Sequence, residues 1–212
     1  MDPYKTTFET WNKLAGLYQE KFMDLDLYNN SYDLFLKRVL KPNPVILEIG
    51  CGPGNISKYL LKKNPDIQIE GIDIAPNMIE LAKINNPSAK FRVMDSRDIH
   101  SLRAQYDGII CGFCIPYLSE SDCAKLILDC RERSSENAIL YLSFVEGDYS
   151  KSGYLPASTG DLTYFYYHDL ERLKKQLAEN NFQLLDLLKV NYEKSDGRFE
   201  LNTIMIAKLR SQ

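Results

Sequence analysis

Apolar and polar residues follow two different periods along this chain, and each period predicts a different element. Short apolar runs bounded by turn residues predict strands, whereas apolar residues three and four positions apart predict helices. Between residues 45 and 144 the two patterns alternate, which indicates a parallel sheet with helices on both faces. The predicted strands are Val45–Ile49, Ile67–Ile72, Phe91–Met94, Tyr106–Cys111 and Ala138–Phe144, and the predicted helices are Ile56–Lys63, Pro76–Ile84 and Ser119–Arg133.

The carboxy-terminal part of the chain ends this alternation. A helix is predicted at Asp169–Asn180, and two strands follow at Phe182–Tyr192 and Phe199–Leu209. Between the strands lies Ser195-Asp196-Gly197-Arg198, and its Asp-Gly pair is a hairpin signal, so the strands must be antiparallel. We therefore expect an α/β fold with a doubly wound, seven-stranded sheet: five parallel strands, a sixth after the last helix and a reversed seventh.

Two further segments lie outside this pattern. Residues 1–43 predict two helices, at Thr7–Phe22 and Ser31–Leu40, the second of them stopped by prolines. The segment 145–163 is rich in glycine and is expected to be irregular; connections of that length often cover a site. No repeat or low-complexity segment divides the chain, so we expect a single domain over residues 1–212.

Composition narrows the class of protein. The chain has 212 residues, 44% apolar and 26% charged, as in an ordinary globular domain. Lys and Arg number 26 against 29 Asp and Glu, which lacks the basic excess of a nucleic-acid binder. The first residues lack a secretory signal pattern, and no segment has the apolar length of a membrane span. We expect a cytoplasmic monomer or homodimer without nucleic-acid or membrane partners.

The five cysteines raise the question of a metal or redox site. Cys111 and Cys114 form a C-x-x-C, but no second such pair exists and the chain has only two histidines. Cys123 and Cys130 fit the apolar side of the helix that ends at Arg133. We therefore expect no metal site.

The stretch LEIGCGPGN, residues 47–55, is the main candidate for ligand binding. An apolar strand enters Gly50, Gly52 and Gly54 at alternate positions, which predicts a strand, a tight turn and a helix with backbone close to a ligand. A phosphate-binding P-loop is excluded because Lys58 stands at the wrong position. The pattern G-x-G-x-G is also one residue shorter than the dinucleotide fingerprint G-x-G-x-x-G.

Three carboxylates near this loop favour one ligand. Glu48 precedes the first glycine by two residues, Asp73 ends the second strand and Asp95 follows the third. Ligands of open parallel sheets bind beyond the carboxyl ends of the strands, where an acid at the position of Asp73 holds ribose hydroxyls. Glu48 would repel a pyrophosphate and attract an ammonium or sulfonium. S-adenosylmethionine has both cationic groups and a ribose.

Four stretches in order resemble the motifs of class I S-adenosylmethionine-dependent methyltransferases, of the small-molecule type. They are VILEIGCGPGNIS, IEGIDIAPNMIELAK, FRVMDSRDI and YDGIICGFCIPYLS, from Val45 to about Tyr117. The resemblance implies a Rossmann-like fold with a reversed seventh strand. It implies S-adenosylmethionine as cofactor, S-adenosylhomocysteine as product and a small-molecule acceptor. E-x-G-x-G-x-G with the following acid is fairly specific for the cofactor and carries no information on the acceptor.

The resemblance also implies roles for individual residues. The methionine and ribose parts of the cofactor would lie on the backbone of Gly50, Cys51, Gly52 and Gly54. Glu48 would support this loop and the methionine ammonium. The ammonium would also meet the carbonyl of Cys111, and the ribose would meet Asp73. The adenine would be held by Ile74, Met78, Asp95 and the Ser96 backbone. Trp11 and Tyr18 match aromatic positions of a lid helix, so residues 1–43 would form a helical lid on a core of residues 44–212.

Catalytic residues are weakly indicated. Methyl transfer mainly needs alignment of the reactants, and a base is required only for a protonated nucleophile of high pKa. His168 is the only candidate base by type, and it fits a helix-start residue better. Tyr117, with Tyr154, Tyr166 and Tyr167, would wall an aromatic acceptor pocket. The stretch Cys114-Ile115-Pro116-Tyr117 lacks the Asn/Asp-Pro-Pro-Tyr motif of adenine and glutamine methylases, which favours a small-molecule acceptor.

Three other interpretations stay open at this point. An NAD(P)-binding oxidoreductase predicts G-x-G-x-x-G, no acid before the glycines and no terminal hairpin, and this sequence has none of the three features. A module that binds S-adenosylmethionine without catalysis is compatible with the same residues, because methyltransferases need no signature catalytic residue. Methylation of a thiol or arsenic species would use Cys111 and Cys114.

Overall fold

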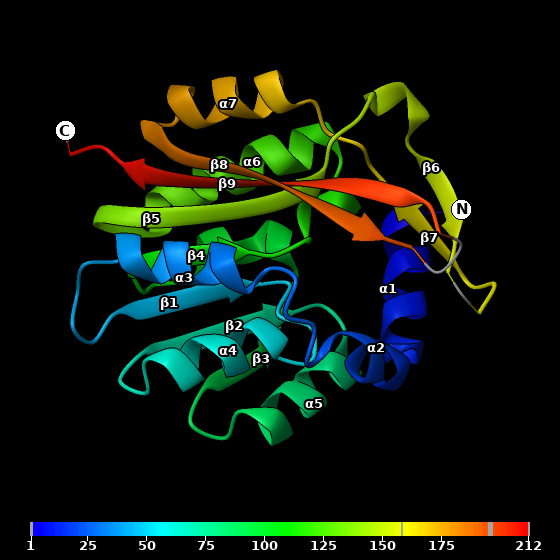
Figure 1. The fold of residues 1–212 in the computed structure, drawn as a ribbon, viewed down its shortest axis with the longest axis horizontal. Coiled ribbons are helices and arrows are strands. Elements are labelled where there is room, and N and C mark those ends of the chain that lie inside the picture. Colours follow the sequence, from blue (N-terminus) through cyan, green and yellow to red (C-terminus); the bar gives the residue numbers. More distant parts are fainter. Residues whose placement is uncertain (1, 158, 195–196, 212) are drawn as a thin grey trace.

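A seven-stranded sheet forms the centre of the molecule (Figure 1). The computed structural model describes residues 2–157, 159–194 and 197–211. The strand order is β3-β2-β1-β4-β5-β9-β8, with β1 to β5 parallel and β9 antiparallel to both of its neighbours. This confirms the predicted Rossmann-like, doubly wound α/β fold with a reversed last strand. The strands are β1 Val45–Ile49, β2 Gln68–Asp73, β3 Lys90–Val93, β4 Tyr106–Cys111, β5 Ser134–Val145, β8 Phe182–Glu193 and β9 Phe199–Leu209.

The reversed strand β9 lies between β5 and β8. Asn202 pairs with Val145 on one side and with Val190 on the other. Because β9 runs opposite to β5, its first residues reach the edge of the sheet where the parallel strands end. The hairpin pattern predicted the reversal but not this insertion. Ser195 and Asp196 of the predicted turn lie outside the described residues.

Helices cover the two faces of the sheet (Figure 1). α3 and α4 pack on one face, α6 and α7 on the other, and α5 packs against β2 and β3. The described helices include none that is both long and apolar enough to cross a membrane. The α-helices are α1 Pro3–Lys13, α2 Ala15–Phe22, α3 Asn29–Arg38, α4 Asn55–Lys63, α5 Pro76–Asn85, α6 Glu120–Arg133 and α7 Leu170–Glu179, and the 3-10 helices are η1 Ser96–Ser101, η2 Ile115–Tyr117 and η3 Tyr149–Lys151.

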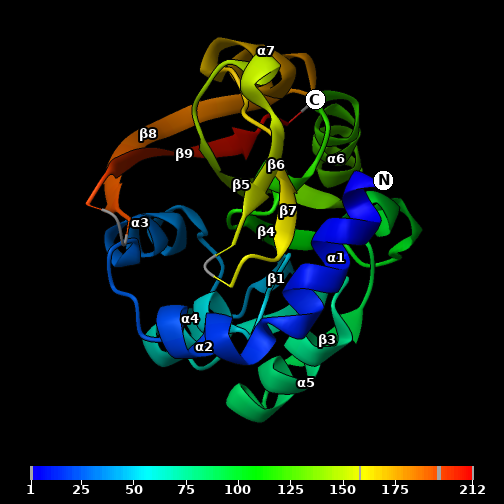
Figure 2. The ribbon, with the colours of Figure 1, turned by 90° about the vertical axis from the view of Figure 1, so that its right-hand side faces the viewer.

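The first forty residues divide differently from the prediction. The expected helix Thr7–Phe22 breaks at Leu14 (φ −92°, ψ 10°), two residues before Gly16, a poor helix former. The resulting α1 and α2 lie across the carboxyl edge of the sheet (Figure 2). In contrast, α3 is part of the layered core, where Phe35 is fully buried with its ring 6.1 Å from that of Tyr141.

The segment 145–163 is more ordered than its glycine content suggested. It contains η3 and leads into an antiparallel hairpin of β6 (Gly153–Pro156) and β7 (Leu162–Phe165), which lies beside α1 (Figure 2). The Thr10 hydroxyl donates to the Leu162 carbonyl (2.6 Å), and the Tyr164 N–H donates to the Thr7 hydroxyl (2.9 Å). The hairpin therefore braces α1. Strands of four residues are too short to show a clear period in the sequence.

Candidate functional site

The glycine loop turns sharply between β1 and α4. Gly50 and Gly52 have φ values of +67° and +52°, in the left-handed region that favours glycine. A Cβ on Gly50 would lie 2.8 Å from the Cβ of Cys114, so a side chain there would clash. A Cβ on Gly52 would meet only the ring of Tyr18, at 3.6 Å. The turn thus brings bare backbone to the carboxyl edge of the sheet.

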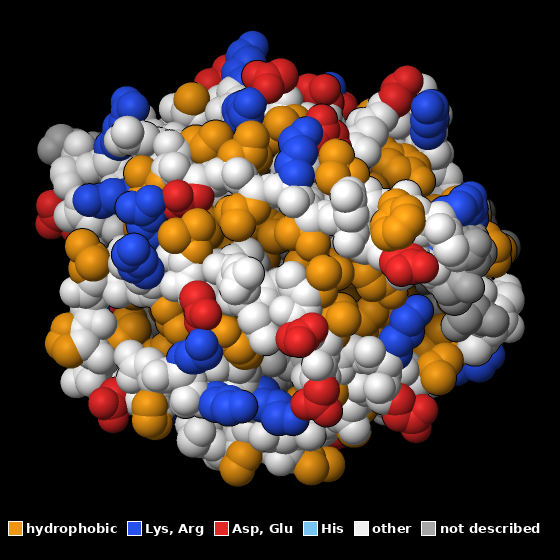
Figure 3. Space-filling view, in the orientation of Figure 1, with side chains coloured by type: hydrophobic (Ala, Val, Ile, Leu, Met, Phe, Trp, Pro, Cys, Tyr) orange, Lys and Arg blue, Asp and Glu red, His pale blue; other side chains and the backbone are white. Residues whose placement is uncertain are grey.

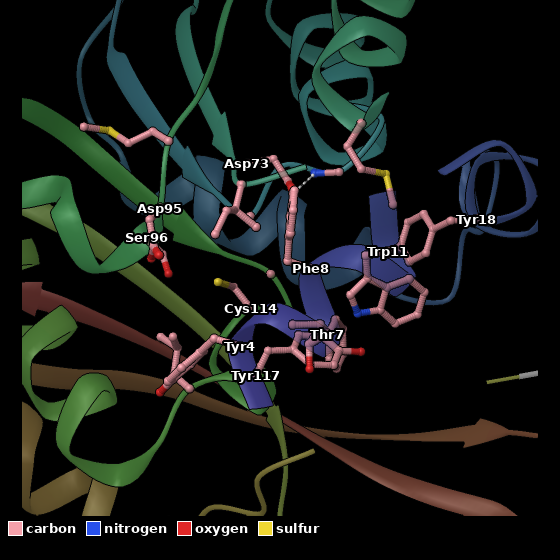
Figure 4. Close-up of a pocket in the computed structure, with 18 residues that line it drawn as sticks. Tyr4, Thr7, Phe8, Trp11, Tyr18, Asp73, Asp95, Ser96, Cys114 and Tyr117 are labelled. Carbon is pink, nitrogen blue, oxygen red and sulfur yellow. Dashed lines mark hydrogen bonds between the residues drawn. The ribbon is translucent and has the colours of Figure 1, made fainter. Parts of the chain in front are cut away.

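Asp73 ties this loop to the end of β2. One carboxylate oxygen accepts a hydrogen bond from the Gly52 N–H (2.9 Å) and the other accepts one from the Ala75 N–H (2.9 Å), as Figure 4 shows in part. Burial raises the pKa of Asp73, against the opposing effect of these two bonds. A carboxylate has about four acceptor sites, so Asp73 retains capacity for further donors.

Glu48 lies at the other end of the loop, on β1. Its side chain is buried, and one oxygen accepts a hydrogen bond from the Ser57 hydroxyl. The other oxygen, Oε1, has no hydrogen-bond partner among the described residues. Burial raises the pKa of Glu48 to about 8. An unsatisfied buried polar atom costs about 1–3 kcal/mol, so a ligand that supplies a donor here would be stabilised.

Two adjoining cavities meet at the glycine loop. The first lies between α1 and the ends of β2 and β3 (Figure 4), and the second lies between α2, α3 and the start of β9. Both are lined by Trp11, Tyr18, Gly50, Gly112, Phe113 and Tyr117. Trp11 contacts the rings of both Tyr18 and Tyr117 edge to face, at 5.6 and 5.7 Å between centroids. These three aromatic side chains therefore stand at the junction of the cavities.

The first cavity brings together most of the residues that the resemblance implied for cofactor binding. They are Tyr18, Gly50, Gly52, Asp73, Ile74, Met78, Asp95 and Ser96. Glu48 lines the second cavity, which shares Gly50 with the first. Cys51, Gly54 and Cys111 line neither cavity, and both thiols are buried in the core. Cys111 is followed by Gly112, Phe113 and Cys114, which do line the first cavity.

Asp95 is engaged by a residue that the sequence analysis did not identify. Its carboxylate accepts from Arg97, at 3.0 Å to Nε and 2.6 Å to Nη2. Burial alone would raise the pKa of Asp95, but these hydrogen bonds hold it below its ordinary value. The guanidinium of Arg97 lies 4.1 Å from the ring centroid of Tyr4. The Tyr4 hydroxyl donates to Asp122 and accepts from the Ser119 N–H (3.0 Å), so this cluster fastens the start of α1.

His168 does not belong to either cavity. It is buried, and its Nε2–H donates to the Ile115 carbonyl at 2.8 Å, because a carbonyl only accepts. Burial lowers the pKa of His168, so the ring stays neutral. The structure therefore places the candidate base outside both cavities, where it joins the start of α7 to η2.

The predicted aromatic wall is only partly where it was expected. Tyr117 lines both cavities, and burial raises its pKa, which keeps the hydroxyl protonated. Tyr154, Tyr166 and Tyr167 line neither cavity. The second cavity instead contains aromatic residues from distant parts of the chain, which the sequence analysis missed: Phe22, Tyr28, Tyr32, Phe113, Phe165 and Tyr192.

The cysteines give no sign of a metal centre. All five thiols are free, and in the described part of the chain no three His, Cys, Asp or Glu side chains are grouped as metal ligands would be. The neighbouring Cys114 and burial raise the pKa of Cys111. A protonated buried thiol is a poor nucleophile and a poor ligand.

This chain is similar to known methyltransferases in sequence. The family model of a methyltransferase domain matches residues 46–137. The chain is 32% identical to malonyl-[acyl-carrier protein] O-methyltransferase of Anoxybacillus flavithermus over 113 residues, 51% of this chain and 42% of that protein. It spans less than half the length of the first curated relatives that it matches.

Two solved structures share the fold over the whole chain. Magnesium protoporphyrin IX methyltransferase from Synechocystis, solved with bound S-adenosylmethionine, is 18% identical, with a TM-score of 0.73 over 100% of this chain and 98% of the other. A 1,6-didemethyltoxoflavin-N1-methyltransferase from Burkholderia thailandensis is 14% identical, with a TM-score of 0.74 over 100% and 92%. At such identities the likeness concerns the fold. The family model therefore shows a methyltransferase domain over residues 46–137, and the solved structures show that the chain has the fold of S-adenosylmethionine-dependent methyltransferases.

Proposed function

We propose that this chain transfers a methyl group from S-adenosylmethionine to a small-molecule acceptor. The observation that carries the proposal is the placement of two acids at one glycine loop: Glu48 lies just before it on β1, and Asp73 bonds the Gly52 N–H within it. Asp73 faces the first cavity, and Glu48 presents an unpaired oxygen near the junction of the two. The cofactor occupies the first cavity and the acceptor the second, with the reacting atoms between them.

The residues of the first cavity suit each part of the cofactor. Asp73 accepts hydrogen bonds from the ribose hydroxyls, and Ile74 and Met78 contact the adenine. Gly50 and Gly52 allow the methionine part to approach the backbone, because neither has a Cβ. The methionine ammonium supplies the donor that Glu48 Oε1 lacks, and this relieves a buried unsatisfied acceptor.

S-adenosylmethionine supplies a methyl group that bonds to the acceptor nucleophile while the carbon–sulfur electron pair stays on sulfur. The chain's contribution is to align the acceptor and exclude water, which is worth on the order of 7–11 kcal/mol in favourable cases. At the junction of the cavities, alignment of the acceptor and exclusion of water fall to Trp11, Tyr18 and Tyr117. The described residues that line the second cavity include no histidine, so we assign no general base.

A small molecule is a better acceptor for this surface than a nucleic acid. The chain carries a formal charge of −3. On the face in Figure 3, acidic and basic side chains are interspersed around a band of apolar ones, without a basic field. A cytoplasmic location and a monomeric or homodimeric state stay predictions.

Two alternatives are disfavoured by particular residues. A nicotinamide dinucleotide would bring its pyrophosphate to the glycine loop, beside the buried Glu48 carboxylate, which repels it once ionised. Methylation of a thiol through Cys111 and Cys114 conflicts with the burial of Cys111 outside both cavities. If replacing both cysteines by serine abolished transfer but left the fold intact, the thiol mechanism would be restored.

Transfer itself separates an enzyme from a module that only binds the cofactor. The purified chain is incubated with S-adenosylmethionine labelled in its methyl group and with fractions of a small-molecule extract. We expect one fraction to gain label as S-adenosylhomocysteine forms, and Asp73→Ala to remove that gain. Cofactor binding with no labelled fraction would favour the non-catalytic module.

A further inference from the structure

In the proposed function the second cavity binds the acceptor, and the side chains of its wall indicate which charge that acceptor carries. We propose that it binds an acceptor through a positively charged amine and discriminates against carboxylates and phosphates; this rests on the proposed methyltransferase function. Among the described lining residues, the ionisable ones besides tyrosine are two acids, Glu48 and Glu200, with no Lys, Arg or His. An anionic acceptor would therefore meet the carboxylate of Glu200 and no cation among the described residues of the cavity wall.

The aromatic side chains favour the same charge. Tyr28 and Phe113 lie 5.0 Å apart between ring centroids, and Tyr32, Phe165 and Tyr192 complete the wall. The face of an aromatic ring is electronegative and attracts an ammonium, with a larger effect where water is excluded. Tyr28 and Tyr32 are buried, so their ring faces are largely removed from water.

Asn202 adds a buried acceptor to this wall. It is 3% exposed, and its Nδ2 donates to the Tyr28 hydroxyl at 2.6 Å. Its Oδ1 has no hydrogen-bond partner in the described part of the chain, although Asn202 lines the cavity. An ammonium carries donors only and can fill this position, whereas a carboxylate is acceptor-only and cannot. In the proposed function Glu48 serves the methionine ammonium, so Asn202 and Glu200 remain for the acceptor.

The topology places both residues at the reacting edge. Glu200 and Asn202 are two positions apart on β9 and therefore point to the same face of the sheet. Because β9 is antiparallel, its first residues lie at the carboxyl edge of β5, where Asn202 pairs with Val145. Glu200 and Asn202 thus lie at the same edge of the sheet as the glycine loop.

Lys194 is the cation that bears on this proposal. Its ammonium forms an ion pair with Glu200, but it does not line the cavity, and its side chain is 37% exposed. If the acceptor were an anion, the Lys194 ammonium would be a candidate to bind it. Replacing Lys194 separates the two roles, because an amine site gains from a freed Glu200 and an anion site loses a nearby cation.

The test uses two probes with the same ring and opposite charge, phenethylamine and 3-phenylpropanoate. Each is titrated calorimetrically into the protein with and without saturating S-adenosylhomocysteine, near neutral pH, where both are ionised. We expect the amine to bind at least about tenfold more tightly, equivalent to about 1.4 kcal/mol. Glu200→Gln reduces amine binding severalfold, Lys194→Met maintains or strengthens it, and the control Glu193→Gln, at an exposed position on β8, changes nothing.

Equal affinities, tighter binding of the carboxylate, or no amine binding at millimolar concentration would overturn the proposal. So would loss of binding in Lys194→Met. Binding of S-adenosylmethionine and S-adenosylhomocysteine is measured in the same series. If neither binds, the proposed function fails; if both bind without a preference for the amine, only the acceptor class is wrong.

Discussion

The two cavities differ in how far apart along the chain their lining segments lie. The first is formed largely by local units: the glycine loop after β1, Asp73 at the end of β2 and the start of η1 after β3. The second combines α2, the start of α3, the end of β8 and the start of β9, which are far apart in the chain. A cofactor site can therefore be read from motifs, whereas an acceptor site depends on the complete topology.

The largest expected effect concerns the first cavity. Asp73→Ala removes the carboxylate that accepts two hydrogen bonds from the ribose hydroxyls in the proposed function, and it also frees the Gly52 N–H. At about 1.5–3 kcal/mol for each charge-assisted bond, we expect the affinity for S-adenosylhomocysteine to fall at least about a hundredfold. Isothermal calorimetry measures it, with Asp98→Asn, an exposed acid on η1, as the matched control. An unchanged affinity would refute the ribose assignment.

Glu48→Gln is expected to change how the free energy of unfolding depends on pH. Burial raises the pKa of Glu48 from 4.5 to about 8 in the folded state, so the unfolded chain loses this proton at lower pH. Between these two values the native state binds more protons, and stability falls as pH rises, by about 1 kcal/mol per unit. The variant lacks this decline. Denaturant melts from pH 5 to pH 8 check it, and parallel slopes in both proteins would contradict the assignment.

The same residue predicts a pH dependence of binding. An ionised Glu48 attracts the methionine ammonium more strongly than a neutral one. We expect the affinity of the wild-type protein for S-adenosylhomocysteine to rise as pH approaches 8 and to level above it. Calorimetric titrations across this range measure the slope. Glu48→Gln flattens it, and a slope that survives in the variant would show that another group is responsible.

Tyr4→Phe tests whether α1 acts as the lid of the first cavity. The change removes the hydroxyl that bonds Asp122 and the Ser119 N–H but leaves the ring beside Arg97. We expect faster dissociation of S-adenosylhomocysteine and an affinity lowered several-fold, since each lost bond is worth about 1 kcal/mol. Stopped-flow dissociation rates measure this. Tyr149→Phe on η3 is the control, and equal rates in both variants would argue against a lid.

The smallest effect on binding is expected at His168. His168→Ala leaves the Ile115 carbonyl unpaired and lowers the free energy of unfolding by about 1–3 kcal/mol. The affinity for S-adenosylhomocysteine is unchanged, because His168 lines neither cavity. Thermal melts and calorimetry measure the two quantities. A variant with native stability and weakened cofactor binding would return His168 to the site.

The elements with strong periodicity were predicted within a few residues. β1, β4 and β9 have their predicted bounds, because each is rich in apolar residues and begins after a polar or turn segment. β5 begins earlier than predicted, since its first residues are polar and join through the irregular pairing of Tyr106 with Ser134. The hairpin of β6 and β7 was missed because its four-residue strands are too short to show a clear period, and its hydrogen bonds to α1 join segments far apart in the chain.

The candidate site shows the same division. Asp73 and Gly50 could be placed from spacing, since a loop and a strand end are fixed locally. Glu200 and Asn202 could not, because their role depends on the insertion of β9 between β5 and β8. Their alternation with Ile204 was a weak signal, visible once β9 is known to face a cavity. The engagement of Asp95 by Arg97 likewise required coordinates.

The most direct test of the account is one calorimetric series on the wild-type protein with S-adenosylmethionine, S-adenosylhomocysteine and NAD. We predict binding of the first two in the micromolar range, about −8 kcal/mol, and no binding of NAD. That result would establish the cofactor of the first cavity and turn the search to amine acceptors. Binding of NAD, or of none of the three, would contradict the assignment of the Gly50–Gly54 loop.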